Sequence, residues 1–202
     1  ATQSGVKYSG WEMRNAHLSS DIDAQHSETA FLTHRAMEYI ASRSSSKGWC
    51  LHLSYFNPHW PLLAPAPYHE IYKDSDVLKV NKDKVEIKNP HPVFSAFQQL
   101  EYSKNYTDEK KRRHVIPTYM GLISEIDHHI GRLMSFLDEN NLTENTSIIF
   151  TSDHGDYLGD HYLGEKDLFH EPSVRIPLII VDPEMPKKLR GTSEIRIAES
   201  VD

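Results

Sequence analysis

The chain has 202 residues, of which 38% are hydrophobic and 25% charged, proportions typical of a soluble globular protein rather than a disordered one. Its formal net charge of −7 argues against a nucleic-acid-binding protein, and no apolar run approaches the ~20 residues that span a membrane. A single cysteine excludes an internal disulfide, so redox evidence does not set the compartment; we expect the cytoplasm or the periplasm and favour the cytoplasm.

The first predicted element is a helix. Residues 1–25 are polar and lack a strand-like run, which predicts an irregular lead-in. Ser27 to Arg43 then predicts a helix. Gly48 favours a turn into a buried strand, Trp49 to Tyr55, in which we expect Cys50 to be a buried structural thiol. The apolar face predicted for the helix consists of Ala30, Phe31, Met37, Ile40 and Ala41.

The middle of the chain combines loops with the clearest helix. Tyr68 to Tyr72 predicts a short helical turn after a proline-rich loop. Residues 74–113 are polar, and basic runs such as Lys110 to Arg113 lie among acidic residues, which predicts a solvated surface. A broad apolar stripe predicts a helix from Thr118 to Asn140. Inside it, His128 and His129 point about 100° apart, so we expect structural or surface roles for them.

The most informative stretch follows a predicted strand, Thr146 to Phe150, at the kind of strand end where α/β proteins bind ligands. Asp153 and His154 offer an oxygen and a nitrogen to one divalent metal ion; this pair suits Mn²⁺, Zn²⁺ or Fe²⁺, and Ca²⁺ or Mg²⁺ less well. Gly155 lets the backbone turn sharply after them. Lys166 is a mobile charge able to fold back and neutralise a phosphoryl or sulfuryl oxygen. The alternative is a solvated, charged loop.

Further groups surround this motif. Asp156, Asp160, His161 and Glu165 either orient the metal ligands or lie on the loop surface. We expect Arg175 to pair with Glu171 or Asp156, in a structural role. Ile176 to Val181 predicts another strand, and residues 195–202 the start of a further element. The order of helices and strands predicts an α/β fold.

The string Asp-His-Gly-Asp-x-Leu-Gly-Asp-His-x-Leu-x-x-Lys, which ends at Lys166, resembles the sulfatase family of the alkaline-phosphatase superfamily. The likeness is greatest to phosphonate monoester hydrolases and choline-sulfatase-like enzymes. It implies a three-layer αβα sandwich, of which residues 1–202 are the central to C-terminal portion and residues 74–113 a variable insertion. It also implies that His59, in a Pro-His-x-Pro loop, faces the substrate and hydrogen-bonds the leaving-group oxygen or acts as an acid. Alternatively, His59 is an ordinary loop histidine between two prolines.

The resemblance implies a hydrolase of sulfate or phosphonate/phosphate esters, acting on a small anionic ester with one metal ion. The family's nucleophile is a formylglycine made from a Cys/Ser-x-Pro-x-Arg motif, which this chain lacks, as it lacks an aspartate-bearing N-terminal strand. We therefore expect a fragment that is inactive alone. The alternatives are a two-metal phosphatase or phosphodiesterase and a non-catalytic binding module. The Asp-His pair favours the phosphonate branch without deciding the ester, and the oligomeric state stays open.

Overall fold

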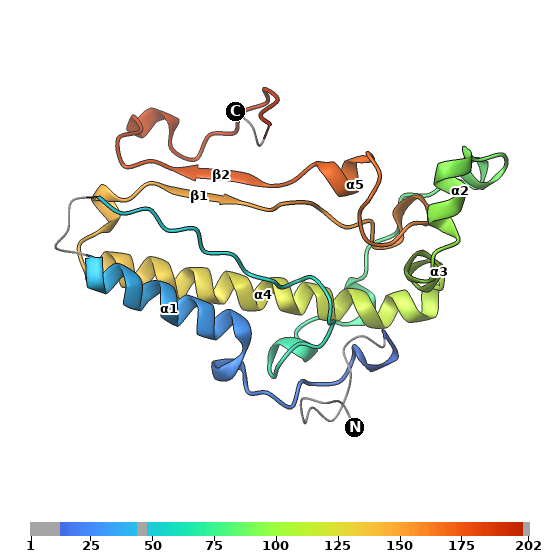
Figure 1. Cartoon of the computed structure of the whole chain (residues 1–202), viewed down its shortest axis with the longest axis horizontal. Helices are drawn as coiled ribbons and strands as arrows, with labels where there is room; N and C mark the ends of the chain where they lie inside the picture. The colour runs from blue at the N-terminus through green and yellow to red at the C-terminus, as the bar shows by residue number, and fades with distance from the viewer. Residues whose placement is uncertain (1–12, 44–47, 200–202) are drawn as a thin grey trace.

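Two long helices form the base of the molecule, in a computed structural model that describes residues 13–43 and 48–199. Helix α1 (Glu28–Arg43) and helix α4 (Glu109–Glu139) pack against each other. Strands β1 (Ile148–Thr151) and β2 (Leu178–Val181) lie on one side of this pair, and the chain after Trp49 passes between strands and helices in the view of Figure 1. The described residues therefore combine a helical layer with a small sheet.

Helix α1 confirms the predicted helix, but the predicted apolar face is wrong at Phe31, which is 59% exposed, and at Ala41, which is also exposed. The small residues and Ile40 that form the buried face bring α1 close to α4. Thr33 belongs to this face because its hydroxyl donates to the Thr29 carbonyl and also bonds the Tyr55 hydroxyl. The buried residues of α1 are Thr29, Ala30, Thr33, Ala36 and Ile40.

Helix α4 begins nine residues before the position expected from the sequence. The Asp108 carboxylate accepts hydrogen bonds from the amides of Lys110 and Lys111 and so caps a helix that starts at Glu109. The helix runs through Pro117, which lacks only one amide donor, and it ends at Glu139 with Asn140 as the cap, within one residue of the predicted end. The basic run at its start was expected to be solvated; this is wrong for Arg112, which is 5% exposed.

The two strands form an antiparallel pair in which Ile149 lies opposite Ile180. This confirms the strands predicted before the metal-ligand motif and after Pro177, each shortened by about two residues at one end. Most of their side chains are exposed on both faces of the sheet, including Ile149 at 66% and Ile180 at 51%.

The strand predicted from Trp49 to Tyr55 is wrong: this segment is extended in Figure 1 but pairs with no strand among the described residues. The reason is that β propensity describes a side-chain pattern, whereas a strand needs a neighbour for its backbone groups. The buried thiol expected at Cys50 is wrong for the same reason, since no neighbouring strand covers it and it is exposed.

Short helical elements fill the rest of the described chain. Tyr68–Glu70 confirms the predicted helical turn. Of the element predicted for residues 195–202, no regular structure is assigned to residues 195–199, and the rest lies outside the described residues. The core lies between α4, α3 and the proline-rich loop, around Trp60, Tyr106 and Leu122. The short elements are η1 Met13–Asn15, η2 Ala24–His26, η3 Tyr68–Glu70, η4 Asp74–Asp76, η5 Lys84–Ile87, α2 Pro92–Gln98, α3 Glu101–Thr107, η6 Thr143–Asn145, η7 Asp160–Tyr162, α5 Glu171–Val174 and η8 Lys187–Leu189.

Candidate active site

Asp153 and His154 follow one residue after the end of β1, and the side-chain atoms that we expect to bind a metal ion lie together. The Nδ1 atom of His154 is 2.7 Å from the Gly155 carbonyl oxygen, a hydrogen bond that places the ring proton on Nδ1. The other ring nitrogen, Nε2, is then free to donate its lone pair, and it lies 3.5 Å from the Asp153 Oδ2 atom. Two electron-pair donors so close together fit a cation that binds both.

The pair is only part of a metal site. Among residues 13–43 and 48–199, no group of three or more His, Cys, Asp or Glu side chains converges in a way that would hold a metal ion. The Asp153 side chain is 86% exposed, so its carboxylate is open to further ligands from solvent or from another part of a larger protein. The donor set therefore fits half of a divalent-metal site.

His59 and Lys166 meet beside this pair, although they are 107 positions apart in the sequence. The Lys166 Nζ atom is 2.9 Å from His59 Nε2, and the His59 ring centre is 6.2 Å from that of His154. The Nδ1 atom of His59 is 3.2 Å from the Trp60 carbonyl oxygen, which orients the ring. The fold thus brings all four sequence-predicted site residues into one region.

Asp156 lies behind these groups, and its carboxyl is shielded from water. Its pKa is raised to about 7, chiefly by burial and also by the neighbouring Glu165 carboxylate, while the Leu158 amide and the Lys166 charge act in the opposite direction. The Leu158 amide donates to Asp156 Oδ1 at 2.9 Å. Asp156 therefore stabilises the turn of the loop.

Gly155 allows close packing rather than the sharp turn that we expected. It is not among the glycines with positive φ. A Cβ atom at this position would lie 2.0 Å from the Pro172 carbonyl oxygen, and the Gly155 amide donates to the Ser173 carbonyl at 2.8 Å. Only glycine lets the loop after β1 lie this close to α5.

Arg112 is a structural support of the site that sequence reasoning missed. Its Nε donates to the Leu158 carbonyl at 2.9 Å and its Nη2 donates to the Leu78 carbonyl at 2.8 Å. One buried guanidinium on α4 thereby joins the motif loop to the segment before η5. Its position inside the short basic run from Lys110 to Arg113 gave no signal, because the run contains exposed residues of the same charge.

The remaining predicted neighbours divide into two groups. Asp160 and His161 bind residues of the 74–113 segment: Asp160 Oδ1 accepts from the Asn81 amide at 2.8 Å, and His161 Nδ1 is 3.1 Å from Glu86 Oε1. Arg175 pairs with Glu171 at 3.4 Å on the surface, as expected. Glu165 points into the site, where its Oε2 is 3.0 Å from Lys166 Nζ.

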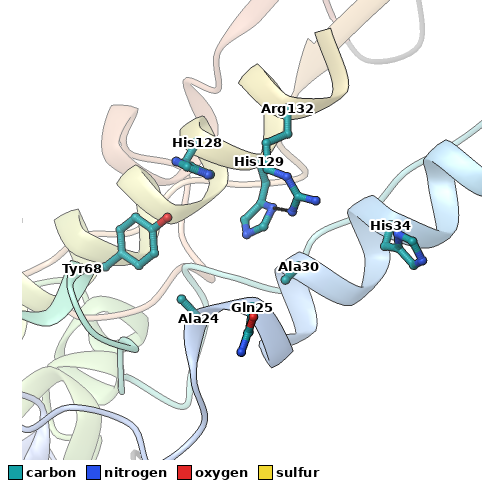
Figure 2. A pocket seen from close by; sticks show the side chains of 8 residues that line it. All are labelled: Ala24, Gln25, Ala30, His34, Tyr68, His128, His129 and Arg132. Carbon is teal, nitrogen blue, oxygen red and sulfur yellow. Dashed lines mark hydrogen bonds between the residues drawn. The ribbon is translucent and has the colours of Figure 1, made fainter. Parts of the chain in front are cut away.

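A hollow of about 330 Å³ lies between α1 and α4 and is lined in part by His128 and His129. His129 is buried, and Arg132 donates to its Nδ1 atom at 3.0 Å, whereas His128 is exposed. Figure 2 shows that the polar groups lining the hollow do not converge, because His34 and Gln25 point away from its centre. Structural and surface positions for these two histidines agree with the expectation from helix geometry.

Comparison with known proteins settles the family. The family model described as sulfatase matches residues 3–202. The chain belongs to the sulfatase family. This sulfatase-family chain is 38% identical over 199 residues to the multifunctional alkaline phosphatase superfamily protein PehA of Trinickia caryophylli, and the match covers 91% of the chain and 38% of PehA. It is 32% identical over 161 residues to the choline-sulfatase of Rhizobium meliloti, covering 77% of the chain and 31% of that enzyme.

The fold comparison agrees. The structure of the phosphonate monoester hydrolase from Silicibacter pomeroyi matches with a TM-score of 0.76 and 28% identity, over 84% of this chain and 35% of that one. This confirms the α/β, alkaline-phosphatase-like fold and the resemblance to the phosphonate monoester hydrolase and choline-sulfatase branch. The chain spans less than two fifths of each of these three relatives. Among the described residues, no helix is both long and apolar enough to cross a membrane.

Proposed function

We propose that this chain is part of a metal-dependent hydrolase of sulfate or phosphonate/phosphate esters. The observation that carries the proposal is the meeting of Lys166, His59 and His154 at the end of β1, with 2.9 Å between the first two side chains and 6.2 Å between the two imidazole centres. A lysine, a histidine and a metal-binding pair from two distant segments are the groups that recognition of a tetrahedral anion requires.

Lys166 would bind the anionic oxygens of the ester. An ammonium group carries three protons. One is directed at His59 Nε2 and one at Glu165 Oε2, which leaves a third for an ester oxygen. The side chain is 28% exposed, so its charge is less screened than that of a surface lysine.

His59 would serve the leaving group. Its Nε2 accepts a hydrogen bond from Lys166 Nζ; by taking up that proton, Nε2 can pass a proton to the departing oxygen, and Lys166 is left neutral. Asp153 and His154 would hold one divalent ion, which when bound polarises the ester oxygens. Asp153, His154, His59 and Lys166 are thus the proposed metal-binding and catalytic residues.

The nucleophile in this proposal is a formylglycine from a Cys/Ser-x-Pro-x-Arg motif elsewhere in the complete enzyme. Cys50 does not fit this role, because it lies in Cys-Leu-His-Leu-Ser. The chain would form the central to C-terminal portion of one catalytic domain, with residues 74–113 as an insertion beside the site. The relatives include a phosphonate monoester hydrolase and a choline-sulfatase, and the proposed site residues are compatible with either type of ester. The Asp-His pair favours a phosphonate ester.

The test is Lys166→Ala in the complete enzyme, assayed with a phosphonate monoester and a sulfate monoester. We expect kcat/KM to fall about 100- to 1,000-fold for the preferred ester, since a charge on the transferring group is lost. Lys188→Ala, which removes an exposed lysine on η8, is the matched control and should leave turnover unchanged. Equal activity of the two variants would remove Lys166 from the mechanism, and no turnover of either ester by the wild type would reject the proposed function.

A further inference from the structure

Glu165 has an unusual backbone for its residue type. Its φ is +63°, in the left-handed region that side chains other than glycine rarely adopt. Such a conformation persists where the surrounding structure requires it, and such positions gather at functional sites. The Glu165 carbonyl accepts a hydrogen bond from the Tyr157 amide at 2.8 Å, which ties the backbone to the start of the same loop.

The side chain of Glu165 is directed at the two proposed catalytic residues. Its Oε2 atom is 3.0 Å from Lys166 Nζ and 3.9 Å from His59 Nε2, and the side chain is 17% exposed. The carboxylate, the ammonium group and the imidazole form a triangle, because Nζ and Nε2 are 2.9 Å apart. The carboxylate is thus turned inward, next to the lysine that follows it in the chain.

A carboxylate in a site for anionic esters weakens substrate binding, because like charges repel. Its presence therefore requires a compensating role. Removing Glu165 would strengthen attraction for an anion if Lys166 kept its place. Lysine, however, is a flexible point charge on a four-carbon stem, and the placement of its ammonium group depends on its partners. A misplaced donor stabilises a transition state poorly. The benefit of holding the Lys166 ammonium group in one position therefore offsets the repulsion between the Glu165 carboxylate and the anionic ester.

We propose that Glu165 is a positioning residue that fixes the Lys166 ammonium group against His59. The inference rests on the proposed hydrolase function and deepens it. Glu165 contacts no substrate in this account and acts through Lys166 alone. Its loss should lower kcat more than it changes KM. Without the carboxylate, the site attracts the anionic substrate more strongly in the ground state, but the transition state loses an aligned hydrogen-bond donor.

Glu165→Gly tests the proposal without backbone strain, because glycine adopts a φ of +63° freely. In the complete enzyme we expect kcat to fall about 10- to 100-fold, as is usual for partners that orient a functional group, with KM within about threefold of wild type and Tm unchanged or higher. Glu165→Gln retains an acceptor oxygen for Lys166 and should recover most of kcat. A kcat of Glu165→Gly within about twofold of wild type would overturn the proposal.

Asp167→Gly is the matched control. Asp167 also has a positive φ, of 92°, and flanks Lys166 on its other side, but its carboxylate accepts from the Tyr102 hydroxyl at 3.1 Å instead. We expect this variant to turn over substrate like the wild type, and an equal loss in both glycine variants would count against a specific role for Glu165.

Crystal structures of wild type and Glu165→Gly provide a readout that is independent of turnover. Displacement of Lys166 Nζ from His59 supports the positioning role even if the ester chosen proves wrong. An unchanged separation overturns the role whatever the activity. If the wild type turns over neither ester but Lys166 is displaced in Glu165→Gly, the proposed function is rejected and the positioning role stands.

Discussion

His129 is a buried imidazole whose neutral form the fold favours. Burial, together with the charge of Arg132 and the neighbouring His128, lowers its pKa to about 4. In the unfolded chain a histidine takes up its proton near pH 6.5. Between these two values the unfolded state binds more protons than the folded state, so the free energy of unfolding should decrease as the pH falls from about 6.5 to about 4, by at most about 1.4 kcal/mol per pH unit.

The measurement is urea denaturation of the 202-residue chain at pH values from 7 to 4. In His129→Gln, whose amide oxygen can accept from Arg132, the part of the slope that comes from this residue should disappear. His52→Gln, which removes an exposed histidine of the extended segment after Trp49, serves as the control. If the slopes of wild type and His129→Gln agree across this interval, His129 does not carry the pH dependence.

At the scale of elements, Arg112 links α4 to the loop that carries the site. Its guanidinium pairs two carbonyls, of Leu158 and Leu78, which a lysine ammonium group could not bridge with the same planar fork. Arg112→Lys should therefore lower the free energy of unfolding by about 2–4 kcal/mol, since a buried charge and a carbonyl lose their partner. Arg113→Lys, at a 47% exposed side chain paired with Glu109, should change it by less than about 0.5 kcal/mol. Equal stability of the two variants would contradict this prediction.

The elements that could be predicted from the sequence are those determined by residues near one another in the chain. Helix α1, most of α4 and both strands follow from periodicity and from capping and turn residues near them in the chain. The burial of Arg112 depends on carbonyls 34 and 46 positions away, and no local pattern contains that information. Asp153 and His154 were recognised as neighbours in the sequence, but the approach of His59 to Lys166 followed only from the resemblance to sulfatases.

For the whole molecule, the exposed sheet is the most consequential surface. Ile149 and Ile180 lie opposite each other in the register, at 66% and 51% exposure, within strands whose other side chains are also mainly apolar. A two-stranded sheet of this kind offers free edges and apolar faces to another molecule. We expect the 202-residue chain alone to self-associate as its concentration rises and to bind the dye ANS, as measured by light scattering and fluorescence.

The double variant Ile149→Thr plus Ile180→Thr tests what this surface is for, because threonine keeps strand propensity while removing apolar area. In the isolated chain it should reduce self-association and ANS binding, whereas Ile195→Thr, at a 96% exposed position outside the sheet, should not. In the proposed complete enzyme the same double variant should be destabilising: if the rest of the catalytic domain covers the sheet, each substitution removes buried contacts and costs about 2 kcal/mol or more of stability. An unchanged or higher stability of the complete enzyme carrying the double variant would mean that the sheet faces solvent there too, which would contradict the placement of this chain inside a larger catalytic domain.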